Sequence, residues 1–277
     1  MLSQFDKAVA FQHLHVRPDA FVIPNPWDAG TARLLSALGF EALATTSAGF
    51  AFTLGRIDSA GAVSGDEILA NAGTIARATD LPVTVDLEDG FGAAPETVAE
   101  TIRRAAAAGL VGGSIEDATS RTDAPIHDFS LAVERVRAAA EAARSLPFPF
   151  IVTARADNFL CGRPDLADTI RRLQAYQEAG ADVLYAPGVT DRDGIAALVH
   201  AVDRPINVVT GLTETSFSVA ELAEIGVKRI SVGGSLARAA LGAVMRAARE
   251  IRDRGSFSYA ANAVPDEDLR RLFSPIP

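Results

Sequence analysis

A repeating unit decides the fold, and it is clearest in LPVTVDLEDGFGAAPETVAETIRRAAAAGLVGGSIED, residues 81–117. A β-rich run at 82–88 precedes a stretch of helical period at 95–108, and a second β-rich run follows at 111–116. Gly109 lies between helix and strand, where a helix commonly ends in the left-handed conformation. A strand, a helix and a further strand in this order predict a parallel sheet.

The same alternation extends in both directions and predicts eight strand–helix pairs. The other expected strands cover residues 20–24, 41–46, 149–155, 182–186, 205–210 and 228–232. The other expected helices cover residues 3–15, 28–38, 65–79, 128–145, 165–179, 191–202, 218–225 and 235–254. Eight units in about 250 residues are typical of a (β/α)8 TIM-type barrel. An open doubly wound sheet is the alternative, but no Gly-rich dinucleotide fingerprint follows the first strand. We expect one barrel domain over 1–277, with an N-terminal helix and a C-terminal helical extension.

Composition excludes several classes of function. The 277 residues are 48% hydrophobic and carry a net charge of −9, so no basic surface is available for nucleic acid, and a membrane surface is disfavoured. Cys161 is the one cysteine, which excludes an intramolecular disulfide and fits a cytoplasmic protein. The N-terminus lacks a signal-peptide core, and no apolar run reaches the roughly 18 residues of a membrane span.

Charged residues at the ends of three neighbouring strands indicate the site. Because side chains alternate along a strand, Asp86 and Glu88 should point into the barrel, as should Glu116 and Arg155 on the next two strands. All lie near strand C-termini, which is the catalytic end of this architecture. Three buried carboxylates against one arginine favour a bound divalent cation. Ligands that are all oxygen favour Mg²⁺, with Mn²⁺ as an alternative. The other interpretation is a set of salt bridges inside the barrel.

Other positions at the mouth are weaker candidates. Trp27 follows the first strand, and Asn207 points inward on the seventh, so both are candidate substrate-binding residues. Gly233 and Gly234 follow the eighth strand, where many barrels bind phosphate. A tight turn explains this pair of glycines equally well.

Several ordered motifs resemble the isocitrate lyase/phosphoenolpyruvate mutase superfamily along almost the whole chain. They are NPWDAGTARLLSALGFEALATTSAGFA at 25–51, GRID at 55–58, DLEDGFG at 86–92, SIEDA at 114–118 and TARADNF at 153–159. The resemblance implies a Mg²⁺-dependent enzyme acting on a small 2-oxo acid. It also implies a homodimer or homotetramer in which a C-terminal helix is exchanged between barrels.

The resemblance assigns roles to individual residues. Asp86 corresponds to the direct metal ligand, and Asp58, Glu88 and Glu116 correspond to the carboxylates that hold the metal's water molecules. For the substrate, it implies a grip on the carboxylate and oxo group by the Ser47 side chain with the backbone amides of Ala48 and Gly49, and pairing with Arg155. Ser47, Asp58 and Arg155 are therefore the expected catalytic residues.

Two departures from the family pattern affect the expected reaction. The loop ATSRTDAPIHD at 118–128 has neither the Lys nor the Cys found there in lyases of this superfamily, and Tyr185 ends the sixth strand where mutases have His. We expect a lyase or decarboxylase that cleaves a C–C bond through an enolpyruvate-like intermediate. The alternatives are a phosphonopyruvate hydrolase or phosphoenolpyruvate mutase acting on a P–C bond, and a barrel that binds an oxo acid without turnover.

Overall fold

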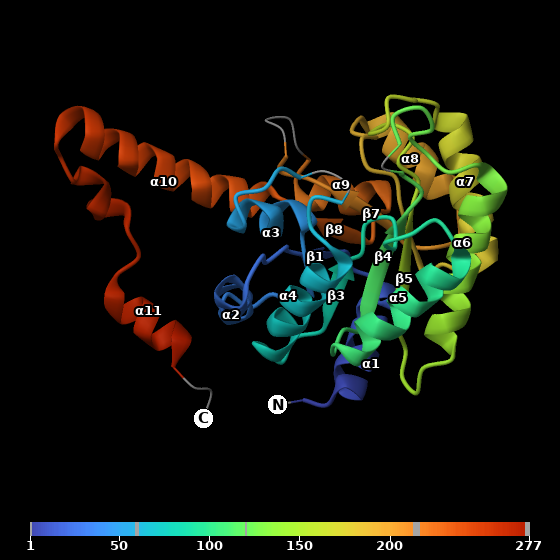
Figure 1. Ribbon diagram of the computed structural model, residues 1–277, viewed down its shortest axis with the longest axis horizontal. Coiled ribbons are helices and arrows are strands. Elements are labelled where there is room, and N and C mark those ends of the chain that lie inside the picture. Colours follow the sequence, from blue (N-terminus) through green and yellow to red (C-terminus); the bar gives the residue numbers. More distant parts are fainter. Residues whose placement is uncertain (1, 59–60, 120, 213–216, 275–277) are drawn as a thin grey trace.

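The computed structural model describes residues 2–58, 61–119, 121–212 and 217–274. Eight parallel strands form a nearly closed barrel surrounded by helices, in the order β1-β8-β7-β6-β5-β4-β3-β2 (Figure 1). The strands are β1 (Phe21–Ile23), β2 (Leu43–Ala44), β3 (Val83–Asp86), β4 (Gly112–Glu116), β5 (Ile151–Arg155), β6 (Val183–Tyr185), β7 (Ile206–Val209) and β8 (Arg229–Ser231). This confirms the predicted (β/α)8 fold.

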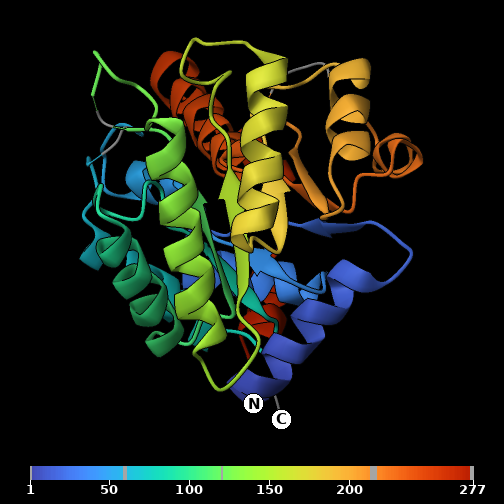
Figure 2. The ribbon, with the colours of Figure 1, turned by 90° about the vertical axis from the view of Figure 1, so that its right-hand side faces the viewer.

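Helices follow the strands as the sequence predicts, and Figure 2 shows α6 and α7 side by side over the outside of the sheet. Their bounds are α1 (Gln4–Val16), α2 (Ala29–Ala37), α4 (Gly65–Arg77), α5 (Pro95–Ala107), α6 (Phe129–Arg144), α7 (Leu166–Ala179), α8 (Arg192–Ala201), α9 (Val219–Ile225) and α10 (Ser235–Arg254). Gly180 and Gly226 end α7 and α9 with φ values of 107° and 99°, a conformation that glycine adopts without a Cβ clash.

Alternation along the strands places apolar residues outside the barrel, against the helices. Val83, Val85 and Leu87 are each at most 1% exposed and belong to the same buried cluster as residues of α4 and α5. At the N-terminal end of the strands, α1 closes the barrel. Its Phe11 is fully buried in a cluster with Phe21 of β1 and strand residues around the interior. The C-terminal end of the strands therefore remains as the open mouth.

One backbone hydrogen bond and the Asn25 side chain close the seam between β1 and β2, which are not paired as a ladder. The Ala44 amide donates to the Pro24 carbonyl at 3.1 Å. Above it, the Asn25 side chain donates to the Thr45 carbonyl and accepts from the Gly233 amide, both at 2.9 Å. Asn25 thus joins the ends of β1, β2 and β8. It also occupies the Gly233 amide, which supports the tight-turn interpretation of the two glycines.

Two strands, β2 and β3, end two residues earlier than the sequence predicts. A strand was expected over 41–46, but β2 has only two residues, and a helix that the sequence analysis missed, α3 (Ser47–Thr53), begins directly after it. Thr46 starts this helix because its hydroxyl accepts from the Gly49 amide. Similarly, β3 ends at Asp86, and Glu88 lies in a turn with φ of 49°.

The C-terminal arm, residues 235–274, extends away from the barrel (Figure 1). In α10, Ala237 is the one buried residue; a short 3-10 helix, η1 (Ser258–Asn262), and α11 (Asp266–Phe273) follow. α11 returns to α2, where Arg33 donates to the Ser274 carbonyl at 2.5 Å. Within the described residues, no helix is long and apolar enough to cross a bilayer.

Candidate active site

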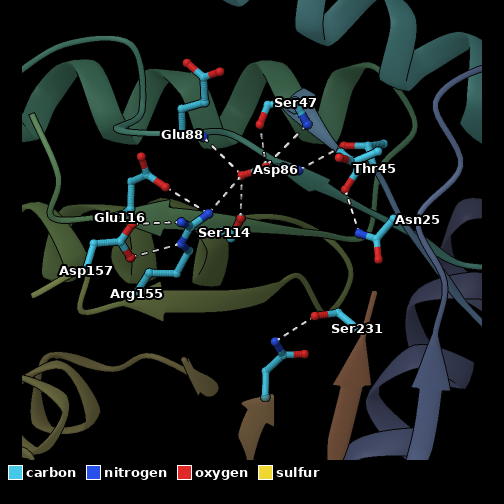
Figure 3. A network of polar contacts seen from close by, with 12 residues as sticks. Asn25, Thr45, Ser47, Asp86, Glu88, Ser114, Glu116, Arg155, Asp157 and Ser231 are labelled. Atoms are coloured by element: carbon cyan, nitrogen blue, oxygen red, sulfur yellow. Dashed lines mark hydrogen bonds and ion pairs between the residues drawn. The ribbon is translucent and has the colours of Figure 1, made fainter. Parts of the chain in front are cut away.

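Asp86 lies at the centre of a polar network at the barrel mouth (Figure 3). The Ser47 hydroxyl donates to Asp86 Oδ2 at 3.0 Å, and the Ser114 hydroxyl donates to Oδ1 at 3.3 Å. The backbone amide of Asp86 donates to the Thr45 hydroxyl at 3.0 Å. Contacts from the ends of β2, β3 and β4 therefore hold this carboxylate in one orientation.

Arg155 joins the carboxylates on the β4–β5 side of the mouth. Its Nη1 lies 2.8 Å from Glu116 and 3.5 Å from Asp86, and its Nη2 lies 2.8 Å from Asp157. The guanidinium also lies 5.3 Å from the centre of the Tyr185 ring. The sequence analysis did not single out Asp157. Its position two residues after Arg155, just beyond the end of β5, is the signal that would have identified it.

A cavity of about 200 Å³ lies at the mouth. Its lining includes the carboxylates of Asp58, Glu88 and Glu116, together with Ser47 and Arg155. Burial, followed by the charges of Asp86 and Asp58, raises the pKa of Glu88 to about 8. Burial also raises the pKa of Glu116 and of Asp58, in the latter case with Asp86 as the next cause. Burial and the neighbouring negative charges thus favour the protonated forms of these three groups, and Arg155 opposes this only in part.

The donor set fits a hard divalent cation that keeps most of its water. Carboxylate and hydroxyl oxygens surround Asp86, which is the chemistry that Mg²⁺ prefers. In the described part of the chain, no three acidic, His or Cys side chains gather closely enough to bind an ion together. A site here would therefore use Asp86 directly, with Asp58, Glu88 and Glu116 acting through water.

The start of α3 forms another wall of the mouth. Ser47 and Ala48 line the mouth cavities, whereas the Gly49 amide donates to its own helix cap, Thr46, at 3.2 Å. Gly49 must be small, because a Cβ there would lie 2.7 Å from Thr46 Cγ2 and 3.0 Å from Trp27 Cβ. Trp27 thus packs behind Gly49, and it is not one of the residues that line the cavities described here.

A second, smaller cavity of about 90 Å³ lies beneath Asp86 inside the barrel. Asn207 borders it, but its side chain donates to Ser231 at 3.0 Å and accepts from Arg229 at 2.9 Å. Arg229 also donates to Thr153 at 3.0 Å, and burial lowers its pKa to about 10. The sequence analysis missed Arg229. Because side chains alternate along β8, Arg229 and Ser231 both point into the barrel, and this alternation could have identified it.

Asp117 supports the site from behind. Its carboxylate accepts from the Asp157 amide at 2.8 Å, from the Tyr176 hydroxyl at 2.6 Å and from Arg172 at 3.0 Å. Asp117 therefore positions Asp157, and it lies at the start of the loop that follows β4. In that loop, Arg121 pairs with Asp123 on the surface.

Comparisons with known proteins agree with this geometry. The family model described as phosphoenolpyruvate phosphomutase matches residues 11–252. A crystal structure from Burkholderia cenocepacia J2315, provisionally assigned as a lyase/mutase, is 60% identical with a TM-score of 0.96, and the match covers 98% of this chain and 97% of that one. An uncharacterized Mycobacterium tuberculosis protein is 33% identical over 88% of this chain and 90% of its own length. The 2-methylisocitrate lyase of Shewanella oneidensis is 30% identical over 81% of this chain and 78% of its own length. The chain therefore belongs to the phosphoenolpyruvate mutase family, within the isocitrate lyase/phosphoenolpyruvate mutase superfamily.

Proposed function

We propose that this protein is a Mg²⁺-dependent lyase or decarboxylase that cleaves a C–C bond in a small 2-oxo or 2-hydroxy carboxylate. The observation that carries the proposal is the arrangement of Asp86 among Ser47, Ser114 and Arg155, with Glu116 on the same guanidinium nitrogen, Nη1, as Asp86. Mn²⁺ offers a similar coordination chemistry and is the alternative ion.

The metal would be held by Asp86, with Asp58, Glu88 and Glu116 orienting its water molecules. When bound, Mg²⁺ would supply Lewis-acid polarisation of the oxygen on C2. Ser47 holds Asp86 through its hydroxyl, and the same side chain lines the cavity that a substrate would enter. Arg155 keeps Asp86 and Glu116 on one side of the mouth and supplies the positive charge that attracts a substrate carboxylate.

The proposed chemistry places a developing negative charge next to these donors. In decarboxylation of a 2-oxo acid with a carboxylate on C3, the C3–C4 bond breaks and C4 leaves as CO₂. The electron pair forms an enolate across C2 and C3, which then takes a proton at C3. We assign two donors to the enolate oxygen: the Ala48 amide, and the Ser47 hydroxyl once it turns from Asp86 to the substrate. Arg155 is assigned to the substrate carboxylate.

The charges at the mouth favour C–C cleavage over P–C cleavage. A phosphonate carries up to two negative charges and is usually bound by several cations. Among the described residues that line the mouth cavities, Arg155 is the one basic side chain. Arg121, in the nearby loop, is paired with Asp123.

An activity screen tests the proposal. The protein is incubated with and without Mg²⁺ and with oxaloacetate, 2-methylisocitrate, dimethylmalate or phosphonopyruvate. Pyruvate release and phosphorus NMR are followed. We expect Mg²⁺-dependent release of a 2-oxo acid from a carbon substrate. Phosphate or phosphoenolpyruvate formed from phosphonopyruvate would contradict C–C specificity, and oxo-acid binding without any turnover would indicate a non-catalytic barrel.

We also propose that the C-terminal arm binds a second copy of the chain, giving a homodimer or homotetramer. Leu241, Val244, Met245 and Ile251 are 40% to 64% exposed along α10, and their spacing places them on one side of the helix. Aromatic residues of the arm, Phe257 and Tyr259, are also exposed. Such an apolar surface is unusual on a monomer and typical of a subunit interface.

A further inference from the structure

The larger mouth cavity, of about 380 Å³, has two chemically different sides. One side is the polar centre, with Ser47, Asp58, Asp86 and Arg155. The opposite side is formed by β7, by the loops after β5, β6 and β7, and by α8 and α9. Its apolar lining residues are Leu160, Pro187, Val189, Ile195, Val208, Leu212, Phe217 and Leu222. We call this second set of residues the apolar wall.

Four residues of the apolar wall are fixed in place by packing in the hydrophobic core. Ile195 and Leu222 are at most 1% exposed, and Val189 and Val208 are at most 8% exposed. These four residues belong to the buried cluster that packs α8 and α9 against β6 and β7. The wall is therefore held in place by the same packing that stabilises this half of the barrel.

None of the described residues of the apolar wall is basic, and Arg238, which donates to the Leu212 carbonyl at 3.0 Å, is not part of the cavity lining. Among the described residues that line this cavity, Arg155 is the one basic side chain, and it already contacts Asp86, Glu116 and Asp157. Thr190 and Thr210 contribute hydroxyl groups. A second carboxylate or a phosphonate directed to this side would lose its hydration without gaining a cation from the described lining.

We infer that the apolar wall binds an uncharged, apolar substituent that the substrate carries beyond C3. This inference rests on the proposed function, because the oxo-acid end must bind at the polar centre for its substituent to reach the wall. The substrate class is then a 2-oxo or 2-hydroxy acid with an alkyl or aryl group on that side. Each methylene placed against such a wall should tighten binding by about fourfold.

Binding of inert 2-oxo acids tests the inference without requiring turnover. Pyruvate, 2-oxohexanoate and 2-oxoglutarate are titrated into the full-length protein with Mg²⁺ by calorimetry. The last two acids have similar chains, one ending in a methyl group and the other in a carboxylate. We expect 2-oxohexanoate to bind at least tenfold more tightly than both others. Equal or tighter binding of 2-oxoglutarate would overturn the inference.

A charge introduced into the wall provides a second test. Leu212 is 37% exposed and lines the cavity, so Leu212→Lys adds a cation with little disturbance of the core. We expect this variant to bind 2-oxoglutarate at least fivefold more tightly and 2-oxohexanoate more weakly. Leu38→Lys, at a 66% exposed position that is not part of the lining, should change neither affinity.

The outcomes separate the inference from the proposed function. If pyruvate binds but 2-oxohexanoate gains nothing, the polar centre works as proposed and the inference about the apolar wall is wrong. If no 2-oxo acid binds with or without Mg²⁺, the proposed function fails, and the inference fails with it.

Discussion

Arg155 holds Asp157 in a forked ion pair, with Nε 3.2 Å from Oδ1 and Nη2 2.8 Å from Oδ2. Arg121 holds Asp123 at the same sequence spacing and in the same geometry, with distances of 3.1 Å and 2.6 Å. The side chains of the first pair are 15% and 3% exposed, and those of the second are 66% and 71% exposed. The chain thus contains the same Arg–Asp ion pair twice, once buried at the barrel mouth and once exposed to solvent.

The first prediction uses this comparison. Asp157→Asn should lower the free energy of unfolding by about 2 kcal/mol, because a hydrogen bond between buried charges is lost and Arg155 loses a counter-charge. Asp123→Asn should leave stability unchanged, because water and salt screen the exposed pair. Urea unfolding of both variants measures the difference. Equal effects in the two variants would show that burial does not control this interaction.

The second prediction concerns the metal. Asp86→Asn keeps the shape of the side chain but removes the charge that we assign to the direct ligand. Loss of partners outside the direct ligands usually weakens metal binding by about 10- to 100-fold, so here we expect a loss of at least about 100-fold. Calorimetry with Mg²⁺, or Mn²⁺ electron paramagnetic resonance, measures the affinity. Asp80→Asn, before β3 at the closed end of the barrel, is the control. Unchanged affinity in Asp86→Asn would remove Asp86 from its proposed role.

The third prediction concerns acid stability and His15. Burial and, as the next cause, the charge of Arg229 lower the pKa of His15 to about 3, whereas a free imidazole titrates near 6.5. Above pH 6.5 the ring is neutral in both the folded and the unfolded chain. Between pH 6.5 and 3 the unfolded chain takes up a proton that the folded ring resists. The free energy of unfolding should therefore fall with decreasing pH, by at most about 1.4 kcal/mol per pH unit from this residue.

Variants of two neighbouring histidines isolate this contribution. His15→Leu should flatten the dependence of the urea midpoint on pH between 6.5 and 3. His13 lies on the same helix but is exposed, so His13→Leu should leave the dependence unchanged. If the two variants have identical pH profiles, His15 titrates normally in the folded protein.

The fourth prediction concerns assembly. Val244→Glu places a charge on the apolar side of α10, where Val244 is 64% exposed. We expect the wild-type protein to be a dimer or tetramer by light scattering and this variant to dissociate, because a carboxylate would be buried at the interface. Ala243→Glu adds the same charge on the opposite side of the helix and should leave the assembly intact. A monomeric wild-type protein would contradict the proposed role of the arm.

Much of the barrel could be predicted from the sequence because its signals are local. Alternating apolar residues in 82–88 and 149–155 indicate which side chains face the helices, and the structure has Val85 and Val152 there and Asp86 and Arg155 inside. Strand ends were harder to predict. Thr46 caps α3 where a strand was expected to continue, because the choice between one more strand residue and a helix cap depends on contacts across the mouth.

The sequence by itself determined the eight-fold alternation and which strands bring Asp86, Glu116 and Arg155 to one end of the barrel, because periodicity and chain order are properties of the chain alone. Only the tertiary structure decided that Asp157 shares Arg155, that Asn25 closes the seam between β1 and β2, and that Asn207 is held by Arg229. It also decided that apolar residues from β7, three loops and two helices face the acidic centre across one cavity. These relationships join residues far apart in sequence, and their distances are set by the closure of the barrel.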